Sequence, residues 1–260
     1  MPEGDAVVRT ARRLDRALAG QVLTSSDFRV PRFAVADLAG GLVTGTHTRG
    51  KHLLTRIEHE GRSWTLHTHL KMEGSWRTYP PGQRWGRPAH TARVVLTSAE
   101  QVAVGFSLGV VELLPRDREE SVVDHLGPDT LGPDWDAAEA ARRLAAHPDE
   151  PIRDALLDQR NLAGVGTMWA AEMLFALRVH PQTRVADVPD LEALVTKGQQ
   201  LLASAVESRR PATWVFDRRR RPCPRCGTPI RTARTGPPGR ERPAYWCPRC
   251  QPEPQSQPRS

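Results

Sequence analysis

Two cysteine pairs are spaced as metal ligands usually are. Cys223 and Cys226 form one C-x-x-C pair, and Cys247 and Cys250 form the second. Four thiolates from two such pairs can surround a zinc ion tetrahedrally. A redox centre needs only one C-x-x-C, and disulfides fit a cytosolic protein poorly. We therefore expect a structural Zn²⁺, which replaces the hydrophobic core that so short a segment cannot build.

The segment between the cysteine pairs has the length of a β-hairpin and is basic. Arginines on a metal-held hairpin are suited to gripping phosphate or reading a nucleic-acid groove. A zinc ribbon that binds protein is the alternative. The arginines in question are Arg231, Arg234, Arg240 and Arg242.

A Gly-x-Gly segment separates two expected helices. The first should run from Ile152 to Arg160, and Gly164 and Gly166 should end it. A second helix should begin near Thr167, which can act as its N-cap, and continue through Glu172. Backbone N–H groups that face outward at a helix start suit a phosphate. A tight helix–helix turn without a ligand is the alternative.

The N-terminus carries an amine and a carboxylate side by side. A small second residue permits removal of Met1, which would leave Pro2 as a secondary amine. Such an amine can attack an electrophilic carbon and form an iminium, and Glu3 could move the protons. Alternatively, the segment merely starts a helix, with an early proline and an acid that complements the helix dipole.

The order of these features resembles the formamidopyrimidine-DNA glycosylase and endonuclease VIII family of base-excision repair. The resemblance runs from Pro2 to about Gln251 and is most specific at the two ends of that range. It implies a bifunctional DNA glycosylase and abasic-site lyase. Pro2 would attack the sugar C1′ carbon, Glu3 would assist base loss and sugar opening, and β- and δ-elimination would follow.

Two features look more like the endonuclease VIII branch, which favours oxidised pyrimidines. They are Trp76 and the pair Tyr245-Trp246. The 8-oxoguanine branch is the alternative within the family. The alternative outside it is a zinc-ribbon protein that binds nucleic acid without catalysis.

The resemblance also implies roles for residues in the middle of the chain. Lys51 matches a lysine that contacts phosphate and donates a proton, and Arg242 matches a hairpin arginine that grips phosphate and helps expel it. Met72, beside Lys71, matches the wedge that fills the space left by a flipped base. The alternatives are an exposed turn lysine for Lys51 and an ordinary core methionine for Met72.

At two positions the chain departs from the family. Thr167 stands where asparagine is usual, and His125 stands where endonuclease VIII proteins can carry a DNA-contacting arginine. A hydroxyl at 167 can still touch phosphate, although it offers no amide. The DNA-binding residues that the resemblance implies are Lys71, Met72, His125, Gly166 and Thr167.

The elements that must position these residues follow from local patterns. Apolar spacing predicts a helix over 5–19, and alternation from 21 to 115 predicts short strands. Asp136 and Asp190 can cap later helices. We predict an α+β multidomain fold: a helix plus β-sandwich (1–132), a helical domain with a helix–two-turn–helix (133–212), a zinc finger (213–251) and a disordered tail (252–260). The strands expected are 53–57, 64–70, 93–97, 102–106 and 110–114.

The charge of the 260-residue chain is uneven. Its formal net charge of +7 comes from 37 basic and 30 acidic residues. Residues 211–260 hold 11 Arg and 3 acids, a net of +8, so the remainder carries −1. A basic segment suggests a polyanion, here damaged double-stranded DNA, and a solubilising tail is the alternative.

No apolar run of about 18 residues exists, which predicts no membrane span. We expect a cytoplasmic bacterial monomer that joins the nucleoid when bound to DNA.

Overall fold

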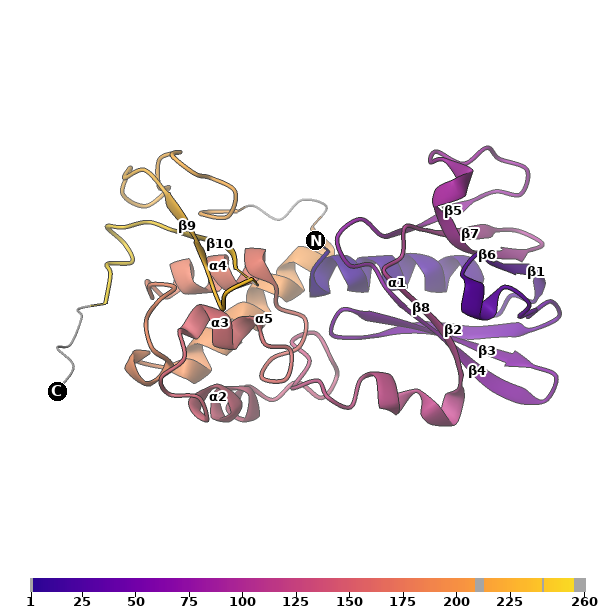
Figure 1. Ribbon diagram of the computed structural model, residues 1–260, viewed down its shortest axis with the longest axis horizontal. Helices are drawn as coiled ribbons and strands as arrows, with labels where there is room; N and C mark the ends of the chain where they lie inside the picture. The colour runs from indigo at the N-terminus through magenta and orange to yellow at the C-terminus, as the bar shows by residue number, and fades with distance from the viewer. Residues whose placement is uncertain (1, 209–212, 240, 255–260) are drawn as a thin grey trace. The chain divides into compact units, whose positions relative to one another are not determined.

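The chain forms two compact units, residues 1–125 and 126–260 (Figure 1). The computed structural model describes residues 2–208, 213–239 and 241–254. The expected disordered tail falls partly on 255–260, and Arg240 of the basic hairpin is also outside the described residues. Among the residues that are described, no helix is both long and apolar enough to cross a membrane.

The first unit is a helix packed with a sandwich of two antiparallel sheets. Helix α1 buries one face, with Val7, Leu14 and Leu18 almost fully enclosed, and it packs against β2. The sheet orders are β1-β6-β7-β5 and β2-β3-β4-β8. The elements are α1 (Gly4–Leu18), β1 (Leu23–Phe28), β2 (Leu42–Arg49), β3 (His52–His59), β4 (Arg62–His69), β5 (Ser75–Tyr79), β6 (Ala92–Ser98), β7 (Val102–Phe106) and β8 (Val110–Pro115).

The expected helix and five strands of this unit are confirmed, within a few residues at their ends. Three strands were missed: β1, β2 and β5. The middle of β1 is polar, and β5 has only five residues, so neither shows a clear alternation of apolar and polar side chains. Pairing with neighbours in the sheet, rather than local pattern, makes them strands.

The β3–β4 pair has two different faces. Leu53, Ile57 and Leu66 point into the buried core of the sandwich. Because successive side chains of a strand alternate, His52 and His67 lie on the opposite face. That outer face carries the polar groups described below.

The second unit combines a helical bundle with a β-hairpin. The elements are α2 (Ala137–Ala145), α3 (Ile152–Leu157), α4 (Thr167–Ala176), α5 (Leu191–Glu207), β9 (Arg231–Thr235) and β10 (Arg242–Trp246). Both predicted caps are confirmed: Asp136 accepts from the N–H of Glu139 at 3.0 Å, and Asp190 from that of Ala193 at 2.8 Å. Short 3₁₀ helices complete the fold at Pro31–Phe33, Ala89–Thr91, Arg116–Arg118, Glu120–Val122 and Val185–Asp187.

Helix α3 is shorter than expected. It ends at Leu157 rather than at Arg160, because the Asp158 carboxylate accepts the backbone N–H of Arg160 at 2.9 Å and pairs with its guanidinium. A local side-chain acceptor of this kind competes with helix continuation. The turn that follows carries Gly164 and Gly166.

The cysteine segment shares a hydrophobic cluster with α4. Phe175 of α4 packs with Val215, Ile230 and Cys247. The predicted α+β architecture, with its sandwich, helical part and cysteine cluster, is therefore confirmed. The exact division into four segments stays a prediction, since the two compact units meet between residues 125 and 126.

Candidate catalytic residues and nucleic-acid interface

Pro2 and Glu3 stand at the start of α1. Glu3 is the residue before the helix, in an extended conformation, and its carbonyl oxygen accepts the N–H of Val7 at 3.0 Å. The segment does start a helix, as its alternative interpretation held. The Glu3 side chain, however, makes no capping hydrogen bond, although only 4% of Glu3 is exposed. The Glu3 carboxylate is thus buried directly beside Pro2 at the start of α1.

Lys51 lies in the turn between β2 and β3, directly after Gly50. Only 6% of Lys51 is exposed, so its interpretation as an exposed turn lysine is wrong. Burying an ammonium group is costly unless its surroundings compensate. A lysine buried at this cost in a turn favours a role in chemistry or binding.

Met72 lies in the loop between β4 and β5. It is 70% exposed, which rules out the interpretation as a core methionine. The loop is tight: the N–H of Gly74 donates to the carbonyl of Leu70 at 2.9 Å, and a side chain at Gly74 would overlap that carbonyl. The loop thus presents a flexible apolar side chain, preceded by Lys71, to solvent.

His125 ends the first unit beside an array of histidines that local sequence patterns do not reveal. Its ring centroid is 6.1 Å from that of His52. The Nδ1 atom of His52 lies 2.7 Å from Nε2 of His67, and Nδ1 of His67 lies 2.8 Å from a carboxylate oxygen of Glu112. His67 and His69 alternate onto one face of β4, and strand pairing supplies their partners.

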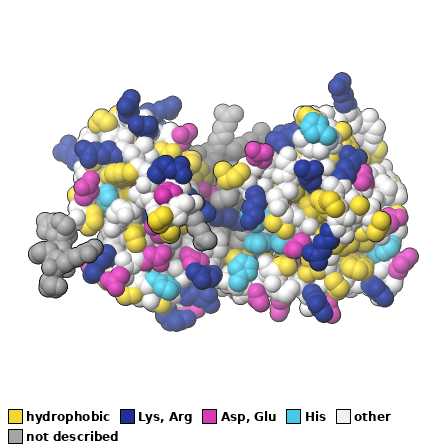
Figure 2. Space-filling model, in the orientation of Figure 1, with side chains coloured by type: hydrophobic (Ala, Val, Ile, Leu, Met, Phe, Trp, Pro, Cys, Tyr) yellow, Lys and Arg dark blue, Asp and Glu magenta, His cyan; other side chains and the backbone are white. Residues whose placement is uncertain are grey.

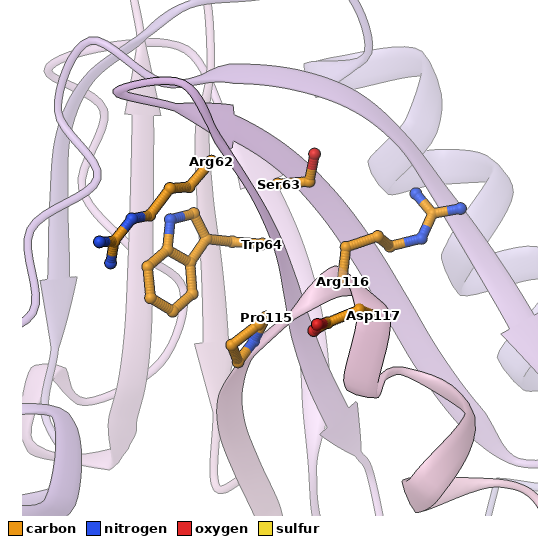
Figure 3. A pocket seen from close by; sticks show the side chains of 6 residues that line it. All are labelled: Arg62, Ser63, Trp64, Pro115, Arg116 and Asp117. Carbon is orange, nitrogen blue, oxygen red and sulfur yellow. The ribbon is translucent and has the colours of Figure 1, made fainter.

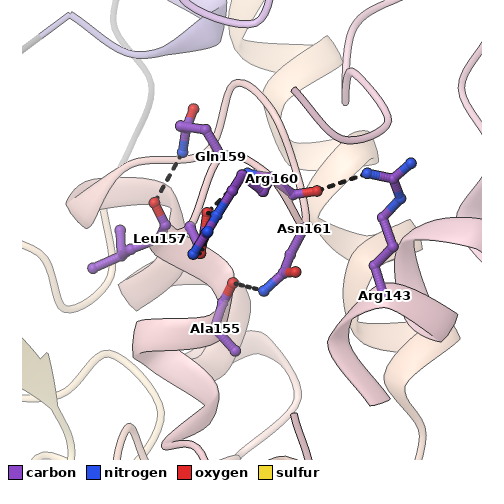
Figure 4. A network of polar contacts seen from close by, with 7 residues as sticks. Arg143, Ala155, Leu157, Gln159, Arg160 and Asn161 are labelled. Atoms are coloured by element: carbon purple, nitrogen blue, oxygen red, sulfur yellow. Dashed lines mark hydrogen bonds and ion pairs between the residues drawn. The ribbon is translucent and has the colours of Figure 1, made fainter. Parts of the chain in front are cut away.

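In the second unit, Gln159 organises the turn between α3 and α4 (Figure 4). Its amide nitrogen donates to the carbonyls of Leu157 and Val165 at 3.1 and 2.9 Å, and its carbonyl oxygen accepts the N–H of Gly164 at 3.1 Å. Our expectation that the N–H of Gly164 faces outward is therefore wrong. The glutamine side chain takes that group because it can accept and donate at once.

Gly166, rather than Thr167, is the N-cap of α4. Its carbonyl accepts the N–H of Ala170 at 2.9 Å, and Thr167 is the first helical residue. The expected N-cap role of Thr167 is therefore wrong, because the extended conformation at the cap falls on the glycine. The expected α3–turn–α4 arrangement itself is confirmed.

Two further contacts hold the same turn from outside. The amide nitrogen of Asn161 donates to the carbonyl of Ala155 at 3.1 Å, and Arg143 of α2 donates to the carbonyl of Arg160 at 2.9 Å (Figure 4). The turn that leads into α4 is thus held by two of its own side chains and by one from α2. A preformed helix start is suited to binding an anion.

The four cysteines lie together as a metal-binding cluster. Their Sγ atoms all lie within 4.8 Å of one another, and three measured Sγ–Sγ distances are 3.4, 3.6 and 3.9 Å. A tetrahedron with metal–sulfur bonds of about 2.3 Å has edges of about 3.8 Å. The donor set and its spacing therefore fit a four-coordinate thiolate site.

The hairpin between the cysteine pairs is confirmed, and it is basic. Strands β9 and β10 pair antiparallel, with Arg242 opposite Thr235. Arg242 is exposed. Figure 2 shows Lys and Arg side chains gathered over the part of the second unit where β9 and β10 lie. Arg153 of α3 is only 3% exposed and donates to the carbonyls of Thr235 and Pro243, so it fixes the strand ends beside Arg242.

Glu172 connects α4 to the segment that enters the cysteine cluster. It is 1% exposed, and its carboxylate accepts the backbone N–H groups of Trp214, Val215 and Phe216 at 2.8, 3.1 and 2.8 Å. Burial raises the pKa of this carboxyl, and the three donors oppose that effect. Local sequence marks Glu172 only as a residue of the expected helix, because its partners lie about forty residues away.

A separate hollow of about 570 Å³ lies at the start of β4 (Figure 3). Strand β4 begins there at Arg62 and reaches His69 seven residues later, a distance of roughly 23 Å at about 3.3 Å per residue. The hollow therefore lies apart from the other end of β4, which leads into the loop of Lys71 and Met72. It is lined by Arg62, Ser63, Trp64, Pro115, Arg116 and Asp117.

Comparison with known proteins agrees with this arrangement. Residues 1–107 match the formamidopyrimidine-DNA glycosylase N-terminal domain, and residues 126–216 match the formamidopyrimidine-DNA glycosylase H2TH domain. A probable endonuclease 8 of Streptomyces coelicolor is 48% identical over 99% of this chain and 96% of its own. A DNA-(apurinic or apyrimidinic site) lyase of Mycolicibacterium smegmatis is 43% identical over 96% of this chain and 99% of its own.

A solved structure shares the fold. It is a Lactococcus lactis formamidopyrimidine-DNA glycosylase bound to DNA with an abasic site, with a TM-score of 0.82, 21% identity, and coverage of 96% of this chain and 100% of that one. Endonuclease 8 of Escherichia coli is 30% identical over 96% of this chain and 100% of its own. The chain thus belongs to the formamidopyrimidine-DNA glycosylase and endonuclease VIII family, on its endonuclease VIII side.

Proposed function

We propose that this protein is a bifunctional DNA glycosylase and abasic-site lyase of base-excision repair. The observation that carries the proposal is Pro2 placed directly before α1 with the buried Glu3 carboxylate beside it. Its full-length likeness to proteins named endonuclease 8 and DNA-(apurinic or apyrimidinic site) lyase supports it. The substrate is damaged double-stranded DNA, with oxidised pyrimidines favoured.

The chemistry begins at the Pro2 amine, once Met1 is removed. The nitrogen attacks C1′ of the sugar, the C1′–base bond breaks, and the base leaves with that electron pair and a proton. The C1′–O4′ bond then breaks, O4′ takes up a proton, and the opened sugar is joined to the protein through an iminium between C1′ and the Pro2 nitrogen. Loss of the C2′ proton breaks the C3′–O bond, and a second elimination breaks the C5′–O bond. Glu3 takes and returns protons in these steps.

The remaining site residues grip and open the DNA. Base excision requires the nucleotide outside the stack, so an apolar wedge must fill the gap. Met72 is the exposed side chain that does this. Lys51 and Arg242 hold phosphates near the lesion, and Arg242 also helps expel the second phosphate. Further phosphate contacts come from Lys71, His125 and the helix start at Gly166 and Thr167.

The metal is Zn²⁺ with a structural role. Four thiolates fill all four positions of a tetrahedral site, which leaves none for a water or substrate. The ion supplies only folding energy, and this chain's own residues do the chemistry. Metal analysis of the purified protein should find one zinc per chain. A metal-free protein with full DNA affinity would contradict the assignment.

We infer a monomer in the bacterial cytoplasm, associated with the nucleoid when it binds DNA. The support is that the curated relatives named above come from bacteria and that the substrate is chromosomal DNA. Sedimentation with and without a damaged duplex would test the stoichiometry. A one-to-one complex is expected, and a dimer on DNA would contradict it.

Borohydride trapping tests the enzyme directly. Borohydride reduces an iminium to a stable bond, so abasic and thymine-glycol duplexes should become covalently attached to protein that lacks Met1. Pro2→Gly should abolish trapping, and Glu3→Gln should abolish base excision. Absence of any covalent complex would favour the zinc-ribbon alternative. Faster excision of 8-oxoguanine than of thymine glycol would favour the other branch of the family.

A further inference from the structure

Lys71 has a backbone conformation that lysine rarely adopts. Its φ is +51°, in the left-handed region that glycine enters without penalty and side-chain-bearing residues avoid. It begins the tight loop that exposes Met72 and that closes through the hydrogen bond between Gly74 and Leu70. Such a conformation persists only where neighbouring contacts compensate for it.

Two contacts do so. The backbone N–H of Lys71 donates to Nδ1 of His69 at 2.9 Å. The lysine stem lies on Gly109, where a Cβ would stand 2.7 Å from Cβ of Lys71 and closer still to its Cγ. Gly109 does not have a positive φ, so its backbone would accept alanine, and only the space taken by Lys71 requires glycine.

The first contact needs His69 to keep a lone pair on Nδ1, and its neighbours are also neutral imidazoles. The Glu112 carboxylate can only accept, so Nδ1 of His67 donates to it. In a neutral His67, Nε2 must then accept, and Nδ1 of His52 donates to that atom. The His52 ring packs edge-to-face on His69, with centroids 5.0 Å apart.

Burial is the main reason that these rings stay neutral. It lowers the pKa of His52 to about 3 and that of His69 to about 4, and it also lowers the pKa of His67. The two lysines act in the same direction, Lys71 on all three rings and Lys51 on His69, whereas the Glu112 carboxylate opposes them by raising the pKa of His67. His125 also lies against the array.

We propose that His69 and Gly109 are positioning residues for the Met72 loop. His69 accepts the Lys71 N–H, Gly109 leaves room for the lysine stem, and together they hold the left-handed turn that points Met72 outward. The array of His52, His67 and Glu112 backs His69 without adding positive charge beside the two lysines. The inference rests on the proposed wedge role of Met72.

A double-mutant cycle between Gly109 and Lys71 tests the inference. The readout is the affinity for a duplex with a stable abasic analogue, relative to undamaged duplex. Gly109→Ala should weaken lesion binding by roughly tenfold, the effect of about 1.4 kcal/mol. In the Lys71→Gly background the same substitution should change affinity by less than about twofold, because the overlapping side chain is gone. Equal losses in both backgrounds would overturn the inference.

The matched control is Gly86→Ala, where the nearest atom to a new Cβ is Oη of Tyr79 at 3.9 Å. It should bind lesion DNA as the parent protein does. A loss equal to that of Gly109→Ala would overturn the inference, since the effect would then be general to glycine replacement.

Substitution of His69 is an independent measurement. In His69→Asn, Oδ1 stands where Nδ1 stood and can accept the Lys71 N–H, as asparagine does in turns. His69→Asn should therefore retain lesion affinity, and His69→Ala should lose it. Two equally weakened variants would overturn the role of His69. Met72→Ala serves to separate the proposals: parent-like lesion affinity in that variant would overturn the wedge role itself, whereas weak binding with an uncoupled cycle would overturn only the positioning.

Discussion

Replacement of Glu172 should loosen the connection between α4 and the cysteine cluster. In Glu172→Ala, three buried N–H donors, those of Trp214, Val215 and Phe216, lose their acceptor. An unsatisfied buried donor costs about 1–3 kcal/mol, so three set an upper bound of roughly 9 kcal/mol. Two effects reduce this upper bound. The substitution removes a carboxylate whose burial raises its pKa, and water can enter the space that it leaves. We expect a net loss of about 3 kcal/mol, as for a broken buried charge pair.

Hydrogen exchange of the 214–216 amides measures this loss directly. A local destabilisation of about 3 kcal/mol corresponds to exchange roughly 100-fold faster. Glu172→Gln should be milder and residue-specific. Its oxygen can still accept from Val215 and Phe216, but its amide nitrogen faces the N–H of Trp214, so mainly Trp214 should lose protection. Release to a chelator of the metal proposed for the cysteine cluster should accelerate in the same order.

The matched control is Glu192→Ala, which removes an exposed glutamate from the first turn of α5. A surface carboxylate near a helix start contributes about 0.3–1 kcal/mol, so exchange at 214–216 should not change. Parent-like protection of 214–216 in Glu172→Ala would refute the reasoning, because it would mean that the three hydrogen bonds do not hold the segment.

Three further outcomes are expected. Cys226→Ser should lose the metal and weaken DNA binding, as metal analysis and binding titration would show; full affinity would contradict the role of the cluster. Arg242→Ala should reduce the slope of log affinity against log salt by about 1, because one phosphate contact is lost; an unchanged slope would exclude that contact. The first unit should lose stability as pH falls from about 6.5 towards 4, since the lowered pKa values of His52 and His69 let the unfolded chain take up protons first. Each ring contributes up to about 1.4 kcal/mol per pH unit, and denaturant titration should show a shallower decline for His69→Asn.

The sequence alone determined the local elements and the candidate chemical groups near the two ends of the chain. Helical periodicity located α1, capping aspartates located α2 and α5, and cysteine spacing identified the metal cluster. These signals lie within a few residues of one another, so they need no knowledge of the rest of the fold. The pairing of Pro2 with Glu3 is a signal of the same local kind.

Only the tertiary structure decided the environment of the functional side chains. It buried Lys51, exposed Met72 and gave the N–H of Gly164 to Gln159. It also joined His52 to Glu112 across three strands, and Glu172 to backbone groups about forty residues later. Burial and hydrogen-bond partnership depend on strand register and on packing between distant segments. Local residue types do not specify these, and so the residues that position the site became visible only in the fold.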